Sequence, residues 1–250
     1  MIRRIKKLLK MNKEKTDLQV EAYNENNPLE EPTNEEVFEA QIQSREEAEL
    51  AADNIDNVPD PEDTTFLETS AEAVGFENRE SQWDTYRVMS QYITPEDSIL
   101  DFGCGRGDFR SFYLSEFETD LTYTGIDFNP QLIDAGKKVN PETNIIHTDW
   151  KVYEGEADWC ISIGSHDVRY DADSVMSDLD YLKNTIKKMY QSCNSGLAIM
   201  LASDTLQQDD GIITWSAPDA LDYALKEFGT ASIDHSYSDA LFTLIIYKND

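Results

Sequence analysis

Residues 98–108 read Ser-Ile-Leu-Asp-Phe-Gly-Cys-Gly-Arg-Gly-Asp, a short apolar run that leads directly into three glycines. The run predicts a buried strand over 98–103, and the stretch after it predicts a helix over 109–117. Glycines between a strand and a helix let the backbone turn tightly and approach a ligand at the carboxyl edge of a sheet. Their spacing is GxGxG, so the third glycine of the dinucleotide fingerprint falls on Asp108, and Asp101 precedes the first glycine by two residues. This arrangement disfavours a pyrophosphate and favours a positively charged ligand.

Short apolar runs alternate with amphipathic stretches throughout residues 73–250. Helices are expected over 80–92, 109–117, 130–139, 174–194 and 217–228, and strands over 98–103, 121–127, 144–149, 158–164, 196–202, 230–236 and 240–248. Strands that alternate with helices predict an α/β fold with a doubly wound, mostly parallel sheet. Only about three residues separate the last two strands, so these two must form an antiparallel hairpin.

Residues 1–72 differ from the rest in composition and are expected to be an N-terminal tail, with the folded domain over 73–250. Residues 1–16 carry seven Lys and Arg and one Glu, whereas residues 17–72 carry one Arg and eighteen acids. An acidic segment with so few apolar residues predicts a largely disordered or helical tail. The basic segment 1–16 has apolar residues at helical spacing. It could dock on a membrane surface or an acidic partner, or form a solvated helix that rests on the protein's own acidic surface.

The overall composition excludes several classes of protein. A net charge of −29 disfavours nucleic acid as a partner, because an acidic surface repels phosphate backbones. No apolar run approaches the roughly 18 residues needed to span a bilayer. The three cysteines, Cys104, Cys160 and Cys193, are odd in number and form no CxxC pair, which excludes a disulfide scaffold and a structural zinc site. We therefore expect a cytoplasmic protein with no metal.

Two more acids stand at predicted strand ends. Asp127 ends the second strand, twenty residues beyond Gly107, where a carboxylate can accept both hydroxyls of a ribose. Asp149 ends the third strand and could accept from an adenine amino group, with Trp150 as a flat neighbour. Each acid alone is compatible with a solvated or capping residue. Together with Asp101 they predict a site for a nucleoside that carries a cationic group.

Four segments at these strand ends resemble the successive motifs of the class I S-adenosylmethionine-dependent methyltransferases. They are ILDFGCGRGDF (99–109), YTGIDFNP (123–130), NIIHTDW (144–150) and DWCISIGS (158–165). The resemblance covers about residues 74–248. A finer resemblance is to a bacterial and phage-type subgroup, which opens and closes with segments like VGFENRESQWDTYR (74–87) and DHSYSDALFTLIIYK (234–248). The family implies a seven-stranded sheet whose last strand is antiparallel, and S-adenosylmethionine as the cofactor.

The same resemblance implies the cofactor-binding residues. Asp101, Gly103 and Gly105 would line the methionine end, Asp127 would hold the ribose, and Asp149 with Trp150 would border the adenine. Arg79 is the available cation for the cofactor carboxylate. The remaining members of the expected cofactor site are Cys104, Phe128, Ser162 and Gly164.

Histidines supply the candidates for catalysis. His166 follows the fourth strand and is the first candidate for substrate contact or general base, with Asp167 expected to orient its ring and raise its pKa toward neutrality. His235 and Tyr237, which resemble a His/Tyr pair of the subgroup, are the second. An exposed loop histidine without a role is the alternative for both, and His147 is expected to pack in the core. The subgroup usually has Phe-Asn where this chain has His166-Asp167.

These features favour a methyltransferase that acts on a small molecule or a protein side chain. The absence of an Asn/Asp-Pro-Pro-aromatic motif after the fourth strand and of a Pro-Cys nucleophile disfavours methylation of DNA bases. A second hypothesis is a methyltransferase-like fold kept as an interaction or virion-associated component, and the long charged N-terminus motivates it. A nicotinamide oxidoreductase is a third hypothesis, weakened by the GxGxG spacing.

Overall fold

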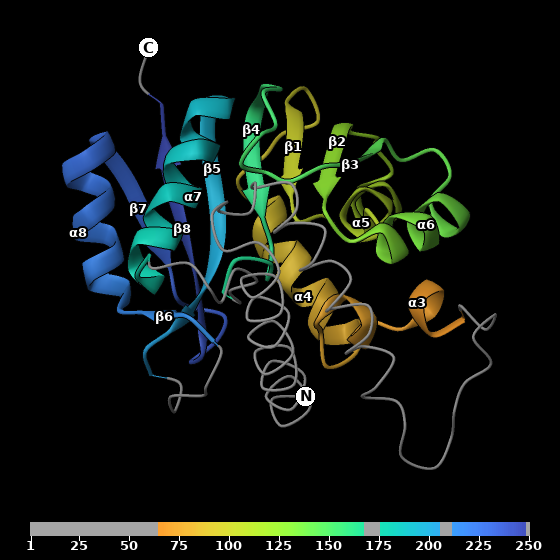
Figure 1. The fold of residues 1–250 in the computed structure, drawn as a ribbon, viewed down its shortest axis with the longest axis horizontal. Helices are drawn as coiled ribbons and strands as arrows, with labels where there is room; N and C mark the ends of the chain where they lie inside the picture. The colour runs from red at the N-terminus through yellow and green to blue at the C-terminus, as the bar shows by residue number, and fades with distance from the viewer. Residues whose placement is uncertain (1–64, 168–175, 206–211, 249–250) are drawn as a thin grey trace, which may run out of the picture. The chain divides into compact units, whose positions relative to one another are not determined.

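The computed structural model describes residues 65–167, 176–205 and 212–248 (Figure 1). The basic segment 1–16 and most of the expected tail lie outside the described residues. The division of the chain at residue 72 therefore stays a prediction.

Seven strands form one sheet in the order β3-β2-β1-β4-β5-β8-β7, and a short β6 pairs with β5. The strands are β1 (Ser98–Phe102), β2 (Thr122–Asp127), β3 (Ile145–His147), β4 (Ala157–Ser162), β5 (Cys193–Ser203), β6 (Thr214–Trp215), β7 (Thr230–Asp234) and β8 (Leu241–Tyr247). β8 runs antiparallel to both β5 and β7, and the neighbouring pairs from β3 to β5 are parallel. The expected doubly wound sheet with its terminal hairpin is confirmed, and β6 is an addition that the sequence pattern did not indicate.

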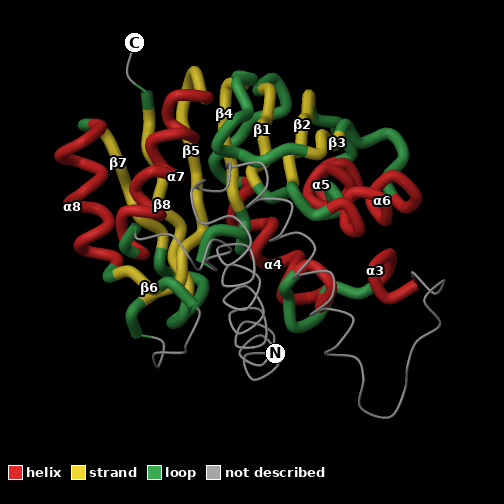
Figure 2. Tube along the Cα trace, viewed as in Figure 1, coloured by secondary structure: helices red, strands yellow, loops and turns green. Residues whose placement is uncertain are grey.

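Helices cover both faces of this sheet. They are α3 (Thr65–Thr69), the 3-10 turn η1 (Glu72–Val74), α4 (Arg79–Ser90), α5 (Asp108–Phe117), α6 (Pro130–Val139), α7 (Asp178–Ser192) and α8 (Ala217–Phe228). Figure 2 shows the strands side by side, with α7 and α8 toward the β7 end and α5 and α6 toward the β3 end. Among the described residues, none of these helices combines the length and apolar character needed to cross a membrane.

Alternate residues of the strands point to opposite faces of the sheet and feed two cores. In β4, Cys160 joins the core formed with α7 and α8, whereas Trp159 and Ile161 join the core formed with α4 and α5. This alternation follows from the period of two in a strand. Because both faces are covered, the central strands read as nearly continuous apolar runs.

Caps decide where the helices begin. Asn129 caps α6 and is followed by a proline in the first turn, so this helix has the expected bounds. The helix expected over 174–194 is shorter, because Ser177 accepts a hydrogen bond from the Asp180 backbone and the chain turns extended at Cys193. β5 therefore starts three residues earlier than expected.

The end of the expected tail is in contact with the domain. α3 packs against α6, and Glu68 forms an ion pair with Lys138 at 2.8 Å. The carbonyl oxygens of Leu67 and Thr69 accept hydrogen bonds from Arg106 and Arg79. Residues 65–69, near the end of the expected tail, thus contact the folded part of the chain.

Candidate functional site

The glycine loop lies at the carboxyl end of β1 and is fastened to the end of β2. Gly103, Gly105 and Gly107 all have positive φ angles, which glycine adopts without a steric penalty. The backbone N–H groups of Gly103 and Cys104 both donate to the Ile126 carbonyl, at 2.8 and 3.1 Å. The loop therefore presents its backbone at the edge of the sheet, as the sequence predicts.

Asp127 connects this loop with the start of the next helix. Its Oδ2 accepts from the Gly105 N–H at 2.8 Å, and its Oδ1 accepts from the Asn129 N–H at 2.8 Å. The residue is 8% exposed. The carboxylate expected at the ribose is thus held in a fixed orientation at the carboxyl end of β2.

Asp101 is buried in β1, directly before the loop. Its Oδ2 accepts from the Tyr123 hydroxyl at 2.6 Å. Burial, together with the charge of Asp127, raises the pKa of Asp101 to about 7, although the bond from Tyr123 opposes the shift. Among the described residues no Lys or Arg forms an ion pair with this carboxyl group.

The end of β3 carries the residues expected near the adenine. Asp149 accepts from the Lys151 backbone N–H at 2.8 Å, and Trp150 is partly buried against the core beneath α7. The partly exposed Phe128 bonds through its carbonyl oxygen to His147 Nε2 at 3.0 Å. The prediction that His147 packs in the core is wrong: β3 is an edge strand and the His147 side chain is exposed.

His166 lies in a polar cluster after β4. Its Nδ1 is 2.9 Å from Ser162 Oγ and 2.7 Å from Ser165 Oγ, and Ser165 also donates to the Phe102 carbonyl. The ring stacks on Tyr181 and meets Trp150 edge to face. Gly164, which precedes the two-residue Ser165-His166 segment, has a φ of 71° and supplies the turn out of the strand.

Two expectations about this histidine are corrected. The ring is 3% exposed, and burial lowers the pKa of His166 to about 3 instead of raising it toward neutrality. Serines, and not Asp167, orient the ring in the described structure. Asp167 has its own raised pKa of about 6, caused by burial. The sequence could not indicate this, because the aromatic rings that contact His166, those of Trp150 and Tyr181, come from other elements.

His235 and Tyr237 lie in the loop between β7 and β8. His235 is exposed and contacts Phe242, and Tyr237 bonds through its hydroxyl to Thr243 at 2.9 Å. Burial raises the pKa of Tyr237 to about 12. None of the contacts recorded for the described residues joins this pair to His166.

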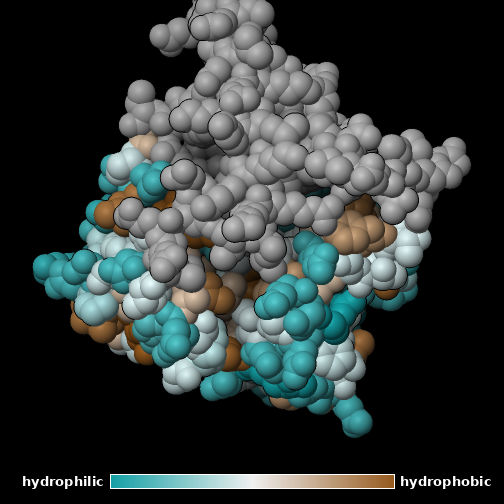
Figure 3. Space-filling model, turned by 90° about the horizontal axis from the view of Figure 1, so that it is seen from below, coloured by the Kyte–Doolittle hydropathy of each residue, from teal (hydrophilic) through white to brown (hydrophobic). Residues whose placement is uncertain are grey.

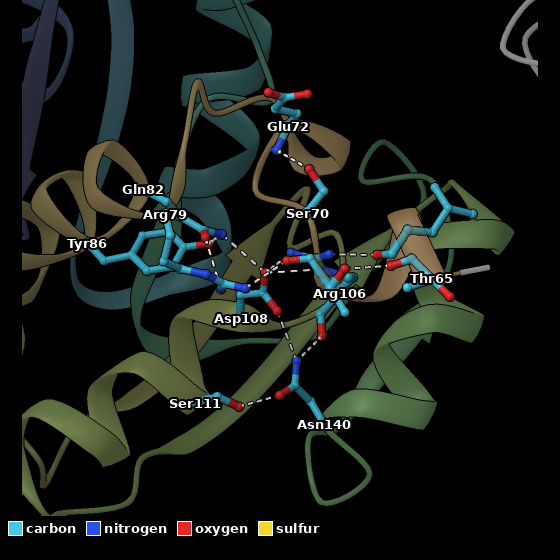
Figure 4. A network of polar contacts seen from close by, with 12 residues as sticks. Thr65, Ser70, Glu72, Arg79, Gln82, Tyr86, Arg106, Asp108, Ser111 and Asn140 are labelled. Atoms are coloured by element: carbon cyan, nitrogen blue, oxygen red, sulfur yellow. Dashed lines mark hydrogen bonds and ion pairs between the residues drawn. The ribbon is translucent and has the colours of Figure 1, made fainter. Parts of the chain in front are cut away.

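Arg79 and a second arginine, Arg106, belong to one network of polar contacts (Figure 4). Arg79 is exposed and donates to Gln82 at 3.2 Å and to the Thr69 carbonyl at 3.0 Å. Arg106, inside the glycine loop, is fully buried and forms an ion pair with Asp108 at 2.5 Å. The sequence contained a signal for this pair, since an Arg and an Asp two residues apart interrupt a glycine run, but their burial could not be foreseen.

Figure 3 shows the molecule from below, and in its coloured part hydrophilic and hydrophobic side chains lie next to one another. Within the described ranges there is no group of three or more His, Cys, Asp or Glu side chains that could hold a metal ion. Cys104, in the glycine loop, has a pKa raised by burial and by neighbouring carboxylates, so its thiol is protonated and unreactive.

A sheet in this strand order, with the hairpin at one end and the glycine loop after β1, is the fold of the class I S-adenosylmethionine-dependent methyltransferases, and the described chain has it. No family model and no curated protein matches the sequence.

Solved structures show the similarity of fold. The PH0226 protein from Pyrococcus horikoshii aligns with a TM-score of 0.53 at 13% identity, over 70% of this chain and 93% of that one. Magnesium protoporphyrin IX methyltransferase from Synechocystis, with bound S-adenosylhomocysteine, aligns with a TM-score of 0.50 at 12% identity, over 74% and 97%. A possible exported protein from Bordetella parapertussis aligns at 0.51 and 15%, over 69% and 68%.

Proposed function

We propose that this chain binds S-adenosylmethionine and transfers a methyl group to a small molecule or a protein side chain. The observation that carries the proposal is Asp101, a buried carboxyl group beside a glycine loop, with a pKa raised to about 7 and no basic ion-pair partner in the described chain. A cationic ligand at this place would favour the charged form of the group and offset the cost of its burial. The bound S-adenosylhomocysteine of the Synechocystis enzyme, which has the same fold, supports the assignment.

The residues at the edge of the sheet fit such a cofactor in their chemistry. Asp101 and the loop from Gly103 to Gly105 would hold the methionine end, and Asp127 would accept from the ribose. The remaining cofactor contacts are proposed for Arg79, Phe128, Asp149, Trp150, Ser162 and Gly164. When bound, the cofactor supplies an electrophilic methyl group on a sulfonium. The chain itself would orient the partners and exclude water, which is the main protein contribution to such a displacement.

Calorimetry tests the proposal directly. S-adenosylhomocysteine should bind to the purified protein, and NAD should not compete. Asp127→Ala should weaken binding by about 1–3 kcal/mol, the scale for a lost hydrogen bond to a charged group. Asp120→Asn, at an exposed ion pair after α5, is the matched control and should bind normally. Absence of binding, or equal affinity in the Asp127 and Asp120 variants, contradicts the proposal.

A further inference from the structure

The polar cluster after β4 contains two acceptor atoms that nothing in the described structure satisfies. Among the described residues, His166 Nε2 and Asp167 Oδ1 are buried and have no hydrogen-bond partner. Buried polar atoms almost always have a hydrogen-bond partner. Two such atoms without a partner, on consecutive residues, therefore require an explanation.

The hydroxyl groups around His166 Nδ1 indicate which tautomer the histidine has. Ser165 has one hydroxyl proton, and it donates this proton to the Phe102 carbonyl at 2.9 Å. The Ser165 oxygen can therefore only accept from His166 Nδ1, 2.7 Å away, so Nδ1 carries the ring proton. Ser162 then donates to Ser165 Oγ at 2.9 Å. In the neutral ring one nitrogen donates and the other accepts, so Nε2 presents a lone pair.

The ring is also fixed in place. It lies against Tyr181 with centroids 6.3 Å apart, and Trp150 meets its edge at 5.7 Å. A Cβ at Gly103 would lie 2.4 Å from Ser165, so this cluster is in direct contact with the glycine loop. On the other side, the Asp167 carbonyl accepts from the Ile213 N–H at 2.7 Å. Ser165, which directly precedes the two residues with the unpaired atoms, is thus in contact with the loop that the proposed function assigns to the cofactor.

We propose that His166 Nε2 and Asp167 Oδ1 together receive the N–H donors of a primary amine or ammonium group on the methyl acceptor. This inference rests on the proposed function for the identity of the ligand as a methyl acceptor. A primary amine supplies at least two N–H donors, which matches two acceptor atoms, whereas a hydroxyl supplies one.

Nuclear magnetic resonance of the full chain with ¹⁵N-labelled histidine tests both steps. In the free protein, His166 should show a protonated Nδ1 and an unprotonated Nε2. Methylammonium chloride, small enough for a buried site, should then shift the Nε2 resonance in a saturable way. Tetramethylammonium chloride has the same charge but no N–H, and it should leave the resonance unchanged. The exposed His235 is the internal control and should respond to neither salt.

Two variants make the test specific. Asp167→Asn keeps the shape of the side chain, converts part of it into a donor, and should weaken the methylammonium response about tenfold or more. Ser238→Ala, in the loop between β7 and β8, is the control and should leave the response unchanged. An Nε2 that carries the proton, an equal response to both salts, or no response overturns the inference. Calorimetry with S-adenosylhomocysteine on the same sample separates this failure from a failure of the proposed function.

Discussion

Replacing Asp108 by asparagine tests the ion pair that joins the glycine loop to the segment before it. Asp108 Oδ2 accepts from Arg106 Nε at 3.1 Å and from Nη2 at 2.5 Å, and it also accepts from Gln82. Asn140 donates to the other carboxylate oxygen, and the remaining Arg106 nitrogen, Nη1, donates to the Leu67 carbonyl at 2.6 Å. The side chains of three separate segments, those of Gln82, Arg106 and Asn140, therefore donate to one carboxylate.

The magnitude follows from the burial of the pair. The Arg106 side chain is 0% exposed and that of Asp108 is 12% exposed. Removing one partner of a buried pair costs about 3–5 kcal/mol, because the other charge is left uncompensated. Asparagine keeps one acceptor oxygen, so we expect the lower end, about 3 kcal/mol. For a domain of this size that loss corresponds to a fall in Tm of roughly 6–12 °C.

Urea and thermal unfolding, followed by circular dichroism, measure the loss. Glu116→Gln is the control. Glu116 lies on the same helix as Asp108, but it pairs with Arg87 at the surface, so this variant should change the midpoint little. Adding Arg106→Met to Asp108→Asn should recover part of the loss, since no unpaired buried charge remains. An Asp108→Asn midpoint equal to that of Glu116→Gln would refute the reasoning.

Three further outcomes are expected. Burial raises the pKa of Asp101 to about 7, so the folded state keeps a proton that the unfolded chain releases near 3.8. As pH rises from about 4 to about 7, this group therefore lowers the free energy of unfolding. Asp101→Asn should remove that decline, worth at most about 4 kcal/mol, in urea titrations at the two ends of the range. Gly103→Ala places a Cβ 2.4 Å from Ser165 and should weaken S-adenosylhomocysteine binding about tenfold by calorimetry. Gly75→Ala, also at positive φ but in open space, should leave the binding unchanged. Deleting residues 1–64 should change Tm little, because their composition adds few apolar contacts. Deleting residues 1–72 should lower Tm further, because the buried guanidinium of Arg106 then loses the Leu67 carbonyl as its acceptor.

The sequence predicts the edge of the sheet better than the chemistry of its side chains. Strand ends follow from apolar runs that stop at glycine or acid, and neighbouring parallel strands necessarily end at the same edge. The positions of Asp101 and Asp127 therefore needed only local pattern and topology. The helix caps at Asn129 and Ser216 are local in the same sense, and the helices that they start have the expected bounds.

Burial of a single polar side chain depends on contacts between distant segments, and here the sequence pattern fails. His147 and His166 both stand near the carboxyl end of a strand, yet the first is exposed and the second is 3% exposed. The difference is that β3 is an edge strand, whereas β4 is central and has Trp150 and Tyr181 packed over its end. Arg106 shows the same limit, since an arginine in a glycine loop is normally read as solvent-exposed.

Burial also explains how the titratable groups at this edge are related. It raises the pKa of Asp101 and Asp167 and lowers that of His166, so each group is pushed toward its neutral form. An edge of this kind costs folding free energy, because carboxyl groups are kept from water without full compensation. A cation that binds there restores the charged form of the carboxyl groups. Because the site is buried and its dielectric constant is low, the attraction between these charges and the cation is then strong. The arrangement therefore costs stability in the free chain, and it would favour the positively charged sulfonium and amine groups that we propose as ligands.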